Sequence, residues 1–343
     1  MNKKALIAMS GGVDSSVCAY LAIKAGYECV GATMRLCDKD FSSTDADDAA
    51  KVCAKLGIEH HVFDFSKEFK ENVMDRFASD YEKGLTPNPC IECNKYLKFG
   101  LLFDKARAMG CDTIVTGHYA RTEDTPEGYI LRKAKDVSKD QSYVLYSLKR
   151  EMLPHVFFPL GDYTKAEARA IAEEQGFVTA RKSDSQDICF VPDGDYPQVI
   201  SSITGRTYPE GSFVDEDGNV LGTHRGIIRY TVGQRKGLGL ALKEPMYVKE
   251  KRIDTNEVVL CTNEALFSNE LTAVNCNWLS ELGDIVRAKA KIRYNQTEQD
   301  ATVYLKESTT ARIVFDNPQR AIAKGQAVVV YDKDRVLGGG TIV

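Results

Sequence analysis

Strand-like and helical segments alternate through the first third of the chain. A short apolar run at 5–9 is followed by two glycines, and apolar residues then recur at helical spacing over 15–25. Further strand-like runs lie at 29–34, 60–63 and 113–116, with helical runs between them at 44–56, 69–83 and 95–109. This alternation predicts a parallel β-sheet covered by helices on both faces. Ligands of such sheets bind beyond the carboxyl ends of the strands, where 10–16 and Gly117 are expected to lie.

The pattern changes in the second half. After a last clear helix at 165–175, the segments beyond about 197 are short, alternating and punctuated by glycine. The 343 residues are enough for two or three domains. We expect an α/β domain at 1–196, a small β-rich middle domain at 197–264, and a C-terminal β-barrel at 265–343.

The amino-acid composition indicates the class of protein and the cellular compartment in which it is expected. With 43% hydrophobic and 27% charged residues the chain is globular rather than disordered or coiled-coil. It has neither an apolar stretch of about 18 residues nor a signal-peptide pattern, so we expect a cytoplasmic protein that does not bind membranes. Thiols stay reduced there, and the ten cysteines are therefore core residues, metal or cluster ligands, or reactive thiols.

The run Ser-Gly-Gly-Val-Asp-Ser-Ser at 10–16 joins a strand to a helix. Adjacent glycines allow positive φ and leave backbone amides open to an anion, and Ser15 and Ser16 add hydroxyls at a helix N-terminus. The lysine of a Walker A loop is absent. Such a loop suits holding a pyrophosphate, with Asp14 helping to hold Mg²⁺ on the phosphates.

This run resembles the PP-loop of the ATP pyrophosphatase superfamily. Members of that superfamily adenylate a carbonyl or carboxylate oxygen and release pyrophosphate. The resemblance implies ATP contacts from the loop and the end of its strand, with two further residues flanking the adenine. These residues are Ala8, Met9, Ser10, Gly11, Gly12, Val13, Asp14, Ser15 and Ser16, and then Met34 and Gly117.

Three cysteines lie in polar segments where reactive thiols are expected. Two prolines predict a stiff loop over 86–89, followed by a helix that begins near Asn94. The helix N-terminus and nearby Lys95 would both lower the thiol pKa of Cys93. Cys189 lies ninety-six residues later in a polar segment, 183–190. Four other cysteines fall on apolar faces and are expected to be buried, namely Cys18, Cys29, Cys53 and Cys111.

Several separate motifs resemble the tRNA-specific 2-thiouridylases and occur in that family's order. They are SGGVDSS at 10–16, TPNPxxxCN at 86–94, TGHYA at 116–120, KDQSY at 139–143, DSxxICF at 184–190, YTVGQRKGLG at 230–239 and FDNPQRAIAKGQAVVVY at 315–331 before LGGG. The resemblance covers essentially the whole chain. It implies ATP-dependent adenylation of the carbon-2 carbonyl oxygen of the wobble uridine in tRNA. A cysteine persulfide then supplies sulfur, giving 2-thiouridine, AMP and pyrophosphate.

The resemblance also implies roles for individual residues. Cys93 matches the catalytic nucleophile and Cys189 the persulfide carrier, so attack of Cys93 on that persulfide would release sulfide and leave a disulfide. The implied sulfur donor is a cysteine desulfurase or a sulfur-carrier protein. Residues that match target-base and tRNA contacts are Asn88, Pro89 and Cys90, Lys139, Asp140 and Gln141, and Arg293 and Tyr294.

Cys90 departs from the family pattern, which has aspartate at this position. A thiol with a pKa near 8.5 is a poor substitute for a carboxylate base. Cys90, Cys93 and Cys189 would alternatively hold an iron–sulfur cluster whose open iron carries the sulfur. The persulfide and cluster mechanisms both stay open. Zinc is less favoured because no fourth ligand is evident.

Two basic segments stand out in a chain of net charge −4. Residues 225–252 hold eight Lys or Arg and two Glu, and residues 132–150 hold six Lys or Arg and two Asp. They predict a local tRNA-binding surface, although charge runs are often only solvated faces. Two rival functions remain: a PP-loop ATP pyrophosphatase that acts on a different RNA base, and a non-catalytic RNA-binding cluster protein.

Overall fold

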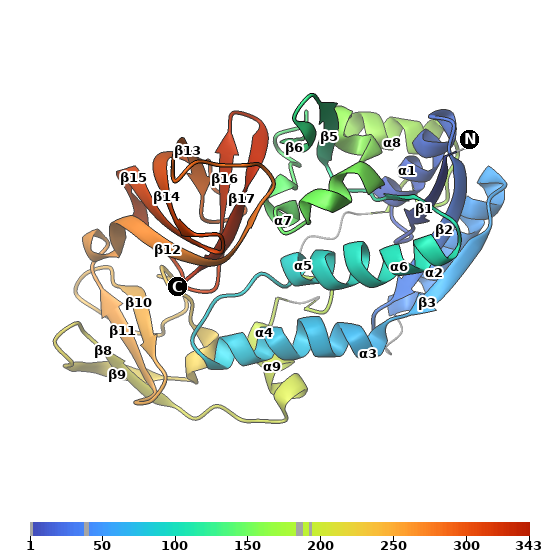
Figure 1. Cartoon of the computed structure of the whole chain (residues 1–343). Helices are drawn as coiled ribbons and strands as arrows, with labels where there is room; N and C mark the ends of the chain where they lie inside the picture. The colour runs from blue at the N-terminus through green and yellow to red at the C-terminus, as the bar shows by residue number, and fades with distance from the viewer. Residues whose placement is uncertain (1–2, 38–40, 183–187, 192–193) are drawn as a thin grey trace.

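The computed structural model describes residues 3–37, 41–182, 188–191 and 194–343. Its strands form three sheets: a parallel sheet in the N-terminal half, a four-stranded sheet, and a large sheet that closes into a barrel (Figure 1). The predicted fold class, an α/β domain followed by a β-rich unit and a β-barrel, is confirmed. Within the described residues no helix is long and apolar enough to span a bilayer.

The N-terminal sheet is parallel throughout, with strand order β3-β2-β1-β4-β7. The central strand β1 is paired with β2 on one side and β4 on the other, so the strand order reverses there, and ligands of such sheets bind beyond the carboxyl ends of the strands at that point. The strands are β1 (Lys4–Ala8), β2 (Glu28–Arg35), β3 (His60–Asp64), β4 (Thr113–Val115) and β7 (Val156–Phe157).

Both faces of this sheet are covered by helices. Because side chains alternate along a strand, Ala5 and Ile7 of β1 enter one apolar cluster and Leu6 enters the other. The first cluster includes residues of α1 (Val13–Lys24), α2 (Phe41–Leu56) and α8 (Lys165–Glu174). The second includes residues of α3 (Ser66–Phe69) and η1 (Lys70–Met74), which α4 (Asp75–Glu82) continues, and of the run α5 (Pro89–Glu92), η2 (Cys93–Leu101) and α6 (Leu102–Ala108).

The four cysteines expected in the core are buried there. Cys18 and Cys53 lie in the first cluster with Cys29, and Cys111 lies in the second. The assignment of these thiols as small apolar core residues is confirmed.

A hairpin that the sequence analysis missed extends the large sheet. It consists of β5 (Ala120–Thr125) and β6 (Gly128–Lys133) and lies between the parallel sheet and the barrel (Figure 1). Strand β6 pairs with the last strand of the chain, with Leu131 opposite Val336. The polar sequence of β5 lacks strand-like alternation, which explains the omission. The short elements that follow are α7 (Ser142–Leu145), η3 (Arg150–His155) and η4 (Pro159–Asp162).

The middle unit packs against helix α4. Its sheet has the order β10-β11-β8-β9, and Phe213, Val248 and Val258 share an apolar cluster with Phe77 and Tyr81 of α4. The elements are α9 (Tyr196–Thr204), β8 (Gly211–Val214), β9 (Val220–His224), η5 (Ile227–Arg229), β10 (Tyr247–Arg252) and β11 (Glu257–Cys261).

The C-terminal strands close into an antiparallel barrel because β12 pairs with both β15 and β17. Glycines make this seam possible. A side chain at Gly338 would overlap the backbone of Asn277, and one at Gly340 would crowd the sulfur of Cys276. The elements are η6 (Glu264–Leu266), β12 (Phe267–Trp278), β13 (Ile285–Lys291), β14 (Gln299–Glu307), β15 (Thr310–Arg320), β16 (Ala327–Asp332) and β17 (Arg335–Ile342).

The loop that links α4 to α5 is held by both downstream units. The amide of Thr86 donates to the carbonyl of Lys324 at 2.8 Å, and Gln326 Nε2 donates to the Thr86 carbonyl at 2.9 Å. From the middle unit, Lys251 Nζ donates to the Leu85 carbonyl at 3.5 Å and lies over the Tyr81 ring. The start of α5 is therefore fixed by contacts from the barrel and the middle unit.

Burial lowers the pKa of Lys251 to about 8. Since the unfolded chain holds this proton up to a pH near 10.4, the charged lysine destabilises the fold below pH 8, and the cost falls as the pH rises between the two values. We expect Lys251→Met to raise the free energy of unfolding by about 1 kcal/mol at pH 7, with the gain disappearing near pH 10.5. Thermal melts at both pH values test this, with exposed Lys243→Met as the control, and a gain that is equal at both would contradict it.

Candidate active site

The glycine loop lies between β1 and α1, at the carboxyl edge of the parallel sheet. Gly11 has φ +70°, and a Cβ there would overlap the backbone of Asp45 in α2. At the end of β4, a Cβ on Gly117 would come within 3.1 Å of the Asp14 side chain. The loop, α2 and the end of β4 are thus in direct contact, and only glycine fits at Gly11.

The two loop serines shape the loop from within. Ser15 Oγ accepts from the Ser10 amide at 3.2 Å and donates to the Gly12 carbonyl at 3.1 Å. Ser16 is fully buried, donating to the same carbonyl at 2.9 Å and pairing with Thr179 Oγ1 at 2.9 Å. These hydroxyls hold the loop in shape, while the first amides of α1 lack carbonyl partners within the helix and suit a phosphate.

Two lysines that the sequence analysis missed contact this loop. Lys165 Nζ pairs with both carboxylate oxygens of Asp14, at 2.7 and 2.9 Å. Lys182 Nζ donates to the Gly11 carbonyl at 3.0 Å and pairs with Asp45 and Asp48 at 2.9 and 2.7 Å. Both lysines are more than 150 residues from the loop residues that they contact. No local motif signals such distant partners.

The remaining residues assigned to ATP lie around the loop. Met9 is buried among the residues of the α1 face, Ala8 and Met34 pack against the opposite cluster, and the Met9 amide donates to Ala32 of β2 at 2.8 Å. Asp14 also accepts from the Tyr119 hydroxyl at 3.1 Å. Asp14 thus pairs with Lys165 in this structure, and its assignment to Mg²⁺ stays a prediction.

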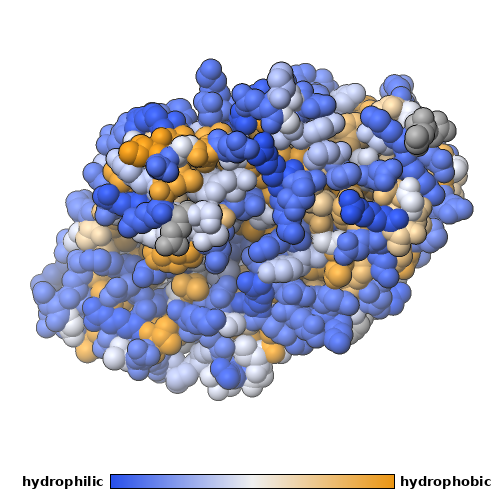
Figure 2. All heavy atoms as spheres, in the orientation of Figure 1, coloured by the Kyte–Doolittle hydropathy of each residue, from blue (hydrophilic) through white to orange (hydrophobic). Residues whose placement is uncertain are grey.

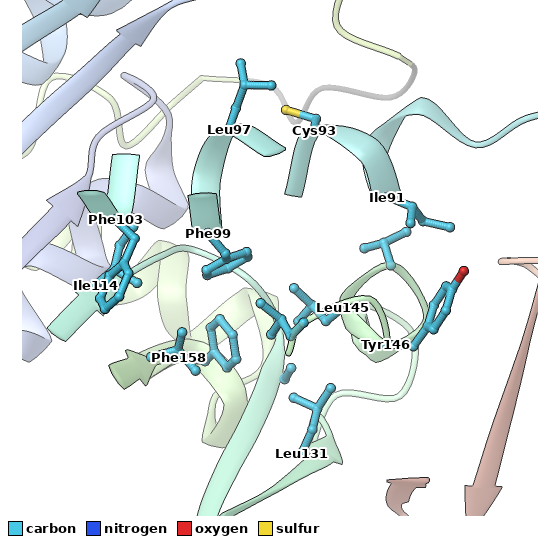
Figure 3. Close-up of a cluster of buried hydrophobic side chains, with 14 of the residues drawn as sticks. Ile91, Cys93, Leu97, Phe99, Phe103, Ile114, Leu131, Leu145, Tyr146 and Phe158 are labelled. Atoms are coloured by element: carbon cyan, nitrogen blue, oxygen red, sulfur yellow. The ribbon is translucent and has the colours of Figure 1, made fainter. Parts of the chain in front are cut away.

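The prediction that the cysteine-bearing helix begins near Asn94 is wrong. The helix begins at Pro89, with Asn88 as its N-cap, whose side-chain oxygen accepts from the Cys90 amide at 3.1 Å. Cys90 therefore lies exposed in the first turn, and Cys93 lies one turn further in. Cys93 is buried at the edge of an apolar cluster, with its sulfur pointing away from Leu145 and Tyr146 (Figure 3). Burial raises the pKa of Cys93, contrary to the expected lowering by a helix N-terminus.

The cation beside the thiols is Lys98 rather than Lys95. Residues Cys93–Leu101 form a π-helix, whose i→i+5 hydrogen bonds place Cys93 and Lys98 on one face. The charge of Lys98 lowers the pKa of Cys93 and of Cys189, against the larger effect of burial. Lys95 is exposed, with its ammonium 5.1 Å from the centre of the Tyr96 ring.

A buried histidine holds Lys98. Lys98 Nζ lies 3.4 Å from His118 Nε2, and His118 Nδ1 lies 2.6 Å from Thr116 Oγ1. Burial and the charge of Lys98 keep the pKa of His118 well below 6.5, so the ring is neutral. An ammonium group only donates, so Nε2 accepts and Nδ1 carries the proton. His118 thus links Lys98 to the end of β4, beside the glycine loop.

The structure places Cys90, Cys93 and Cys189 close enough for the charge of one thiolate to raise the pKa of another. Surrounding protein atoms raise the pKa of exposed Cys189 to about 12, and Cys93, Cys90 and Cys37 add to the rise. Residues 183–187 of the same motif lie outside the described residues. Among the residues that are described, no three His, Cys, Asp or Glu side chains gather closely enough to hold a metal ion. The three thiols, as placed, do not fit an iron–sulfur cluster or a zinc ion.

The positions expected to contact tRNA fall into two groups. Asp140 is buried and accepts from the Ala134 amide and the Ser142 hydroxyl at 2.9 and 2.7 Å, and Gln141 accepts from the Tyr119 amide, so both shape the turn after Lys139. Arg293 donates to the carbonyls of Val232 and Ala321, tying the barrel to the middle unit.

Tyr294 lies at the same junction and remains partly exposed. Its ring packs edge-on against Tyr143 at 6.0 Å. Burial raises the pKa of Tyr294, and negative charge at Asp140 and Cys90 adds to the rise. Through this ring contact Tyr294 connects the barrel to Tyr143 of α7.

Many of the Lys and Arg side chains in the two basic segments form ion pairs with carboxylates of the protein itself. In 132–150, Arg132 pairs with Glu123 and Asp334, Lys133 with Glu298, and Arg150 with Glu281. In 225–252, Lys249 pairs with Glu216 and Arg252 with Glu250. The exposed cations of this second segment are Arg225, Arg229, Arg235, Lys236 and Lys243. Hydrophilic side chains also cover most of the face in Figure 2, with apolar patches among them.

A parallel sheet with a glycine loop at its strand-order reversal defines a nucleotide-binding domain. Three family models match the chain in agreement with this fold. The model described as tRNA methyl transferase HUP domain matches residues 3–193. The tRNA methyl transferase PRC-barrel domain matches 199–262, and the aminomethyltransferase beta-barrel domain matches 268–342.

The chain belongs to the family of tRNA-specific 2-thiouridylases. It is 47% identical to tRNA-specific 2-thiouridylase MnmA of Acetivibrio thermocellus, over 99% of each chain. It is also 47% identical to the protein of that name from Clostridioides difficile, over 100% of this chain and 98% of the relative. A solved 4-thiouridine synthetase–RNA complex with bound ATP has 19% identity and a TM-score of 0.42, over 59% of this chain and 50% of that one. This last likeness carries no argument about the site.

The raised pKa of Cys189 predicts its reactivity. Because the thiolate is the nucleophile, we expect alkylation of Cys189 by iodoacetamide to rise about tenfold per pH unit from pH 7 to 10, without the plateau near pH 9 of an ordinary thiol. Lys98→Met should slow it severalfold at pH 8, whereas Lys95→Met should not. Mass spectrometry of the labelled peptide measures both effects, and an early plateau or equal effects of the two variants would contradict the assignment.

Proposed function

We propose that this protein is an ATP-dependent tRNA-uridine 2-sulfurtransferase that converts the wobble uridine of tRNA to 2-thiouridine. The observation that supports this most directly is the link from the glycine loop to the thiols through one short path, Gly117, His118 and Lys98. An activating site for ATP and a sulfur-transfer site must act on one carbonyl group of the base, the first on its oxygen and the second on carbon 2. Their closeness at one sheet edge meets this requirement.

In the first step the loop at Ser10–Ser16 binds ATP at the start of α1. The carbon-2 carbonyl oxygen of uridine attacks the α-phosphorus and pyrophosphate leaves. Amides at the helix N-terminus stabilise the charge that develops on the phosphate oxygens. Mg²⁺ would accompany the triphosphate and neutralise part of its charge. The product carries AMP on oxygen 2, a far better leaving group than oxide.

In the second step the thiols deliver sulfur. Cys189 carries a persulfide received from a cysteine desulfurase or a sulfur-carrier protein. The Cys93 thiolate attacks the Cys189 Sγ, a Cys93–Cys189 disulfide forms, and hydrosulfide leaves. Hydrosulfide attacks carbon 2 and AMP departs. A dithiol reductant then restores both thiols. Lys98 favours the thiolate forms because it lowers the pKa of both cysteines.

The persulfide route fits the placement of the thiols better than a cluster, because three ligands are not gathered among the described residues. Cys90 faces the target base from the first turn of α5, and Asn88 and Pro89 fix that turn. We assign the catalytic domain to 1–196, the middle domain to 197–264 and the barrel to 265–343. Their junction at Arg293 and Tyr294, with Lys139 and the loop at Arg235 and Lys236, forms the tRNA surface.

The two steps can be separated by cysteine variants. We expect Cys93→Ala and Cys189→Ala to lose 2-thiouridine at least 100-fold while retaining tRNA-dependent pyrophosphate release, since adenylation does not use the thiols. Cys90→Asp should keep both activities. Cys29→Ala, which alters a buried thiol at the start of β2, is the control. Nucleoside mass analysis and a pyrophosphate assay measure the outcome, and full thiolation by either of the first two variants would contradict the assignment.

Iron analysis distinguishes the persulfide mechanism from the iron–sulfur cluster mechanism. Protein purified without oxygen is expected to be colourless and free of iron and acid-labile sulfide, and yet to thiolate tRNA with a persulfide donor. Stoichiometric iron whose removal by a chelator abolishes thiolation, while pyrophosphate release continues, would establish the cluster instead.

The exposed loop at Arg235 and Lys236 should contribute phosphate contacts. Replacing both by alanine is expected to weaken tRNA binding about tenfold at 0.1 M salt and to reduce the salt dependence by one to two units of slope. The control is the double change of exposed Lys24 and Lys55 in α1 and α2. Filter binding at several salt concentrations measures both quantities, and an unchanged slope would remove this loop from the tRNA surface.

A further inference from the structure

The residues of the glycine loop do not themselves offset the negative charge of a bound polyphosphate. Polyphosphate is strongly anionic, and the loop carries Asp14 but no lysine or arginine. The carboxylates of Asp45 and Asp48 in α2 lie beside it, within reach of the Lys182 ammonium. Three carboxylates close to a phosphate site would repel the ligand unless cations offset them.

Lys165 is one such cation and is rigidly placed. Thr164 caps α8 in a capping box with Glu167, so the helix begins at Lys165. Helix α8 packs against α1, the helix that begins at the loop. The side chain is only 13% exposed, and its ammonium lies on the Asp14 carboxylate and 6.0 Å from the centre of the Tyr119 ring.

Lys182 is the second cation at the loop. Its ammonium contacts the Gly11 carbonyl, Asp45 and Asp48, and Arg169 of α8 donates to its backbone carbonyl at 3.1 Å. The same helix therefore supports both lysines. Burial opposes the charge of Lys182, but the hydrogen bonds that its ammonium donates to Asp48 and Asp45 outweigh this, and the pKa of Lys182 is raised. It carries its charge at neutral pH.

We propose that Lys165 and Lys182, which contact the glycine loop at Asp14 and at Gly11, bind the β- and γ-phosphates of ATP and the pyrophosphate that leaves. This rests on the ATP use proposed above. An ammonium group can exchange one carboxylate contact for a phosphate oxygen without losing its charge pairing. Asp14 then acts as a positioning residue that aims Lys165. The two lysines, which lie 151 and 171 residues after the loop residues that they contact, then supply the positive charge that a Walker A lysine supplies within its own loop.

The test compares ligands with and without the outer phosphates. Dissociation constants of MgATP, AMP and inorganic pyrophosphate are measured by calorimetry for Lys165→Met, Lys182→Met and the matching arginine variants. Each methionine variant should weaken ATP and pyrophosphate at least tenfold and AMP by less than threefold, with partial recovery in the arginine variants. Lys55→Met is the control, because its ammonium contacts the Gly176 carbonyl rather than the loop.

Distinct outcomes overturn the proposal. The proposal is overturned if the methionine variants bind ATP as tightly as the unaltered protein. It is also overturned if they lose affinity for ATP and for AMP equally, because the lysines would then only shape the loop. Thermal melts verify folding, and if a methionine variant unfolds, the arginine and glutamine variants at that position supply the same comparison. Failure of the unaltered protein to bind MgATP or pyrophosphate would instead refute the proposed adenylation, and this inference with it.

Discussion

Burial of β1 on both faces is the constraint on which the rest of the structure depends. Leu6 points into one helical layer and Ala5 and Ile7 into the other, so the strand has no freedom of register or tilt. Its carboxyl end then delivers the glycine loop to the point where β2 and β4 diverge. The contacts of Gly11 with α2 and of Gly117 with Asp14 follow from this placement. The glycine loop, a neutral histidine and the thiols beside Lys98 thus share one edge because one strand is fully enclosed.

Local periodicity predicted the sheet, its helices and the β-rich second half, since these patterns reflect burial on one or two faces. The start of the cysteine-bearing helix was misplaced although a signal was present: Asn88 followed by Pro89 is a typical N-cap and first-turn pair. Other features had no local signal. Lys165 and Lys182 reach the loop through tertiary packing, and the π-helix that aligns Lys98 with Cys93 has no periodicity distinguishable over nine residues.

The thiols illustrate two opposed influences on reactivity. Desolvation favours the neutral thiol at Cys93 and Cys189, and Lys98 favours the thiolate. The balance leaves both cysteines poorly reactive as free thiols. Such thiols resist indiscriminate oxidation and alkylation, and in the proposed mechanism a persulfide on Cys189 or a bound substrate would change the surroundings that set the balance. Reactivity then depends on the arrival of a partner rather than on the resting protein.

The pairing of β6 with β17 has a consequence for how the chain reaches its fold. The hairpin β5–β6 belongs to the catalytic half, yet its outer edge is completed only by a strand that lies about 200 residues later. During synthesis on a ribosome that edge stays open until the end of the chain emerges, and the parallel sheet beside it matures before its neighbour is complete. Translation speed through the barrel region, and chaperones that shield an unpaired strand edge, therefore bear on the yield of active protein.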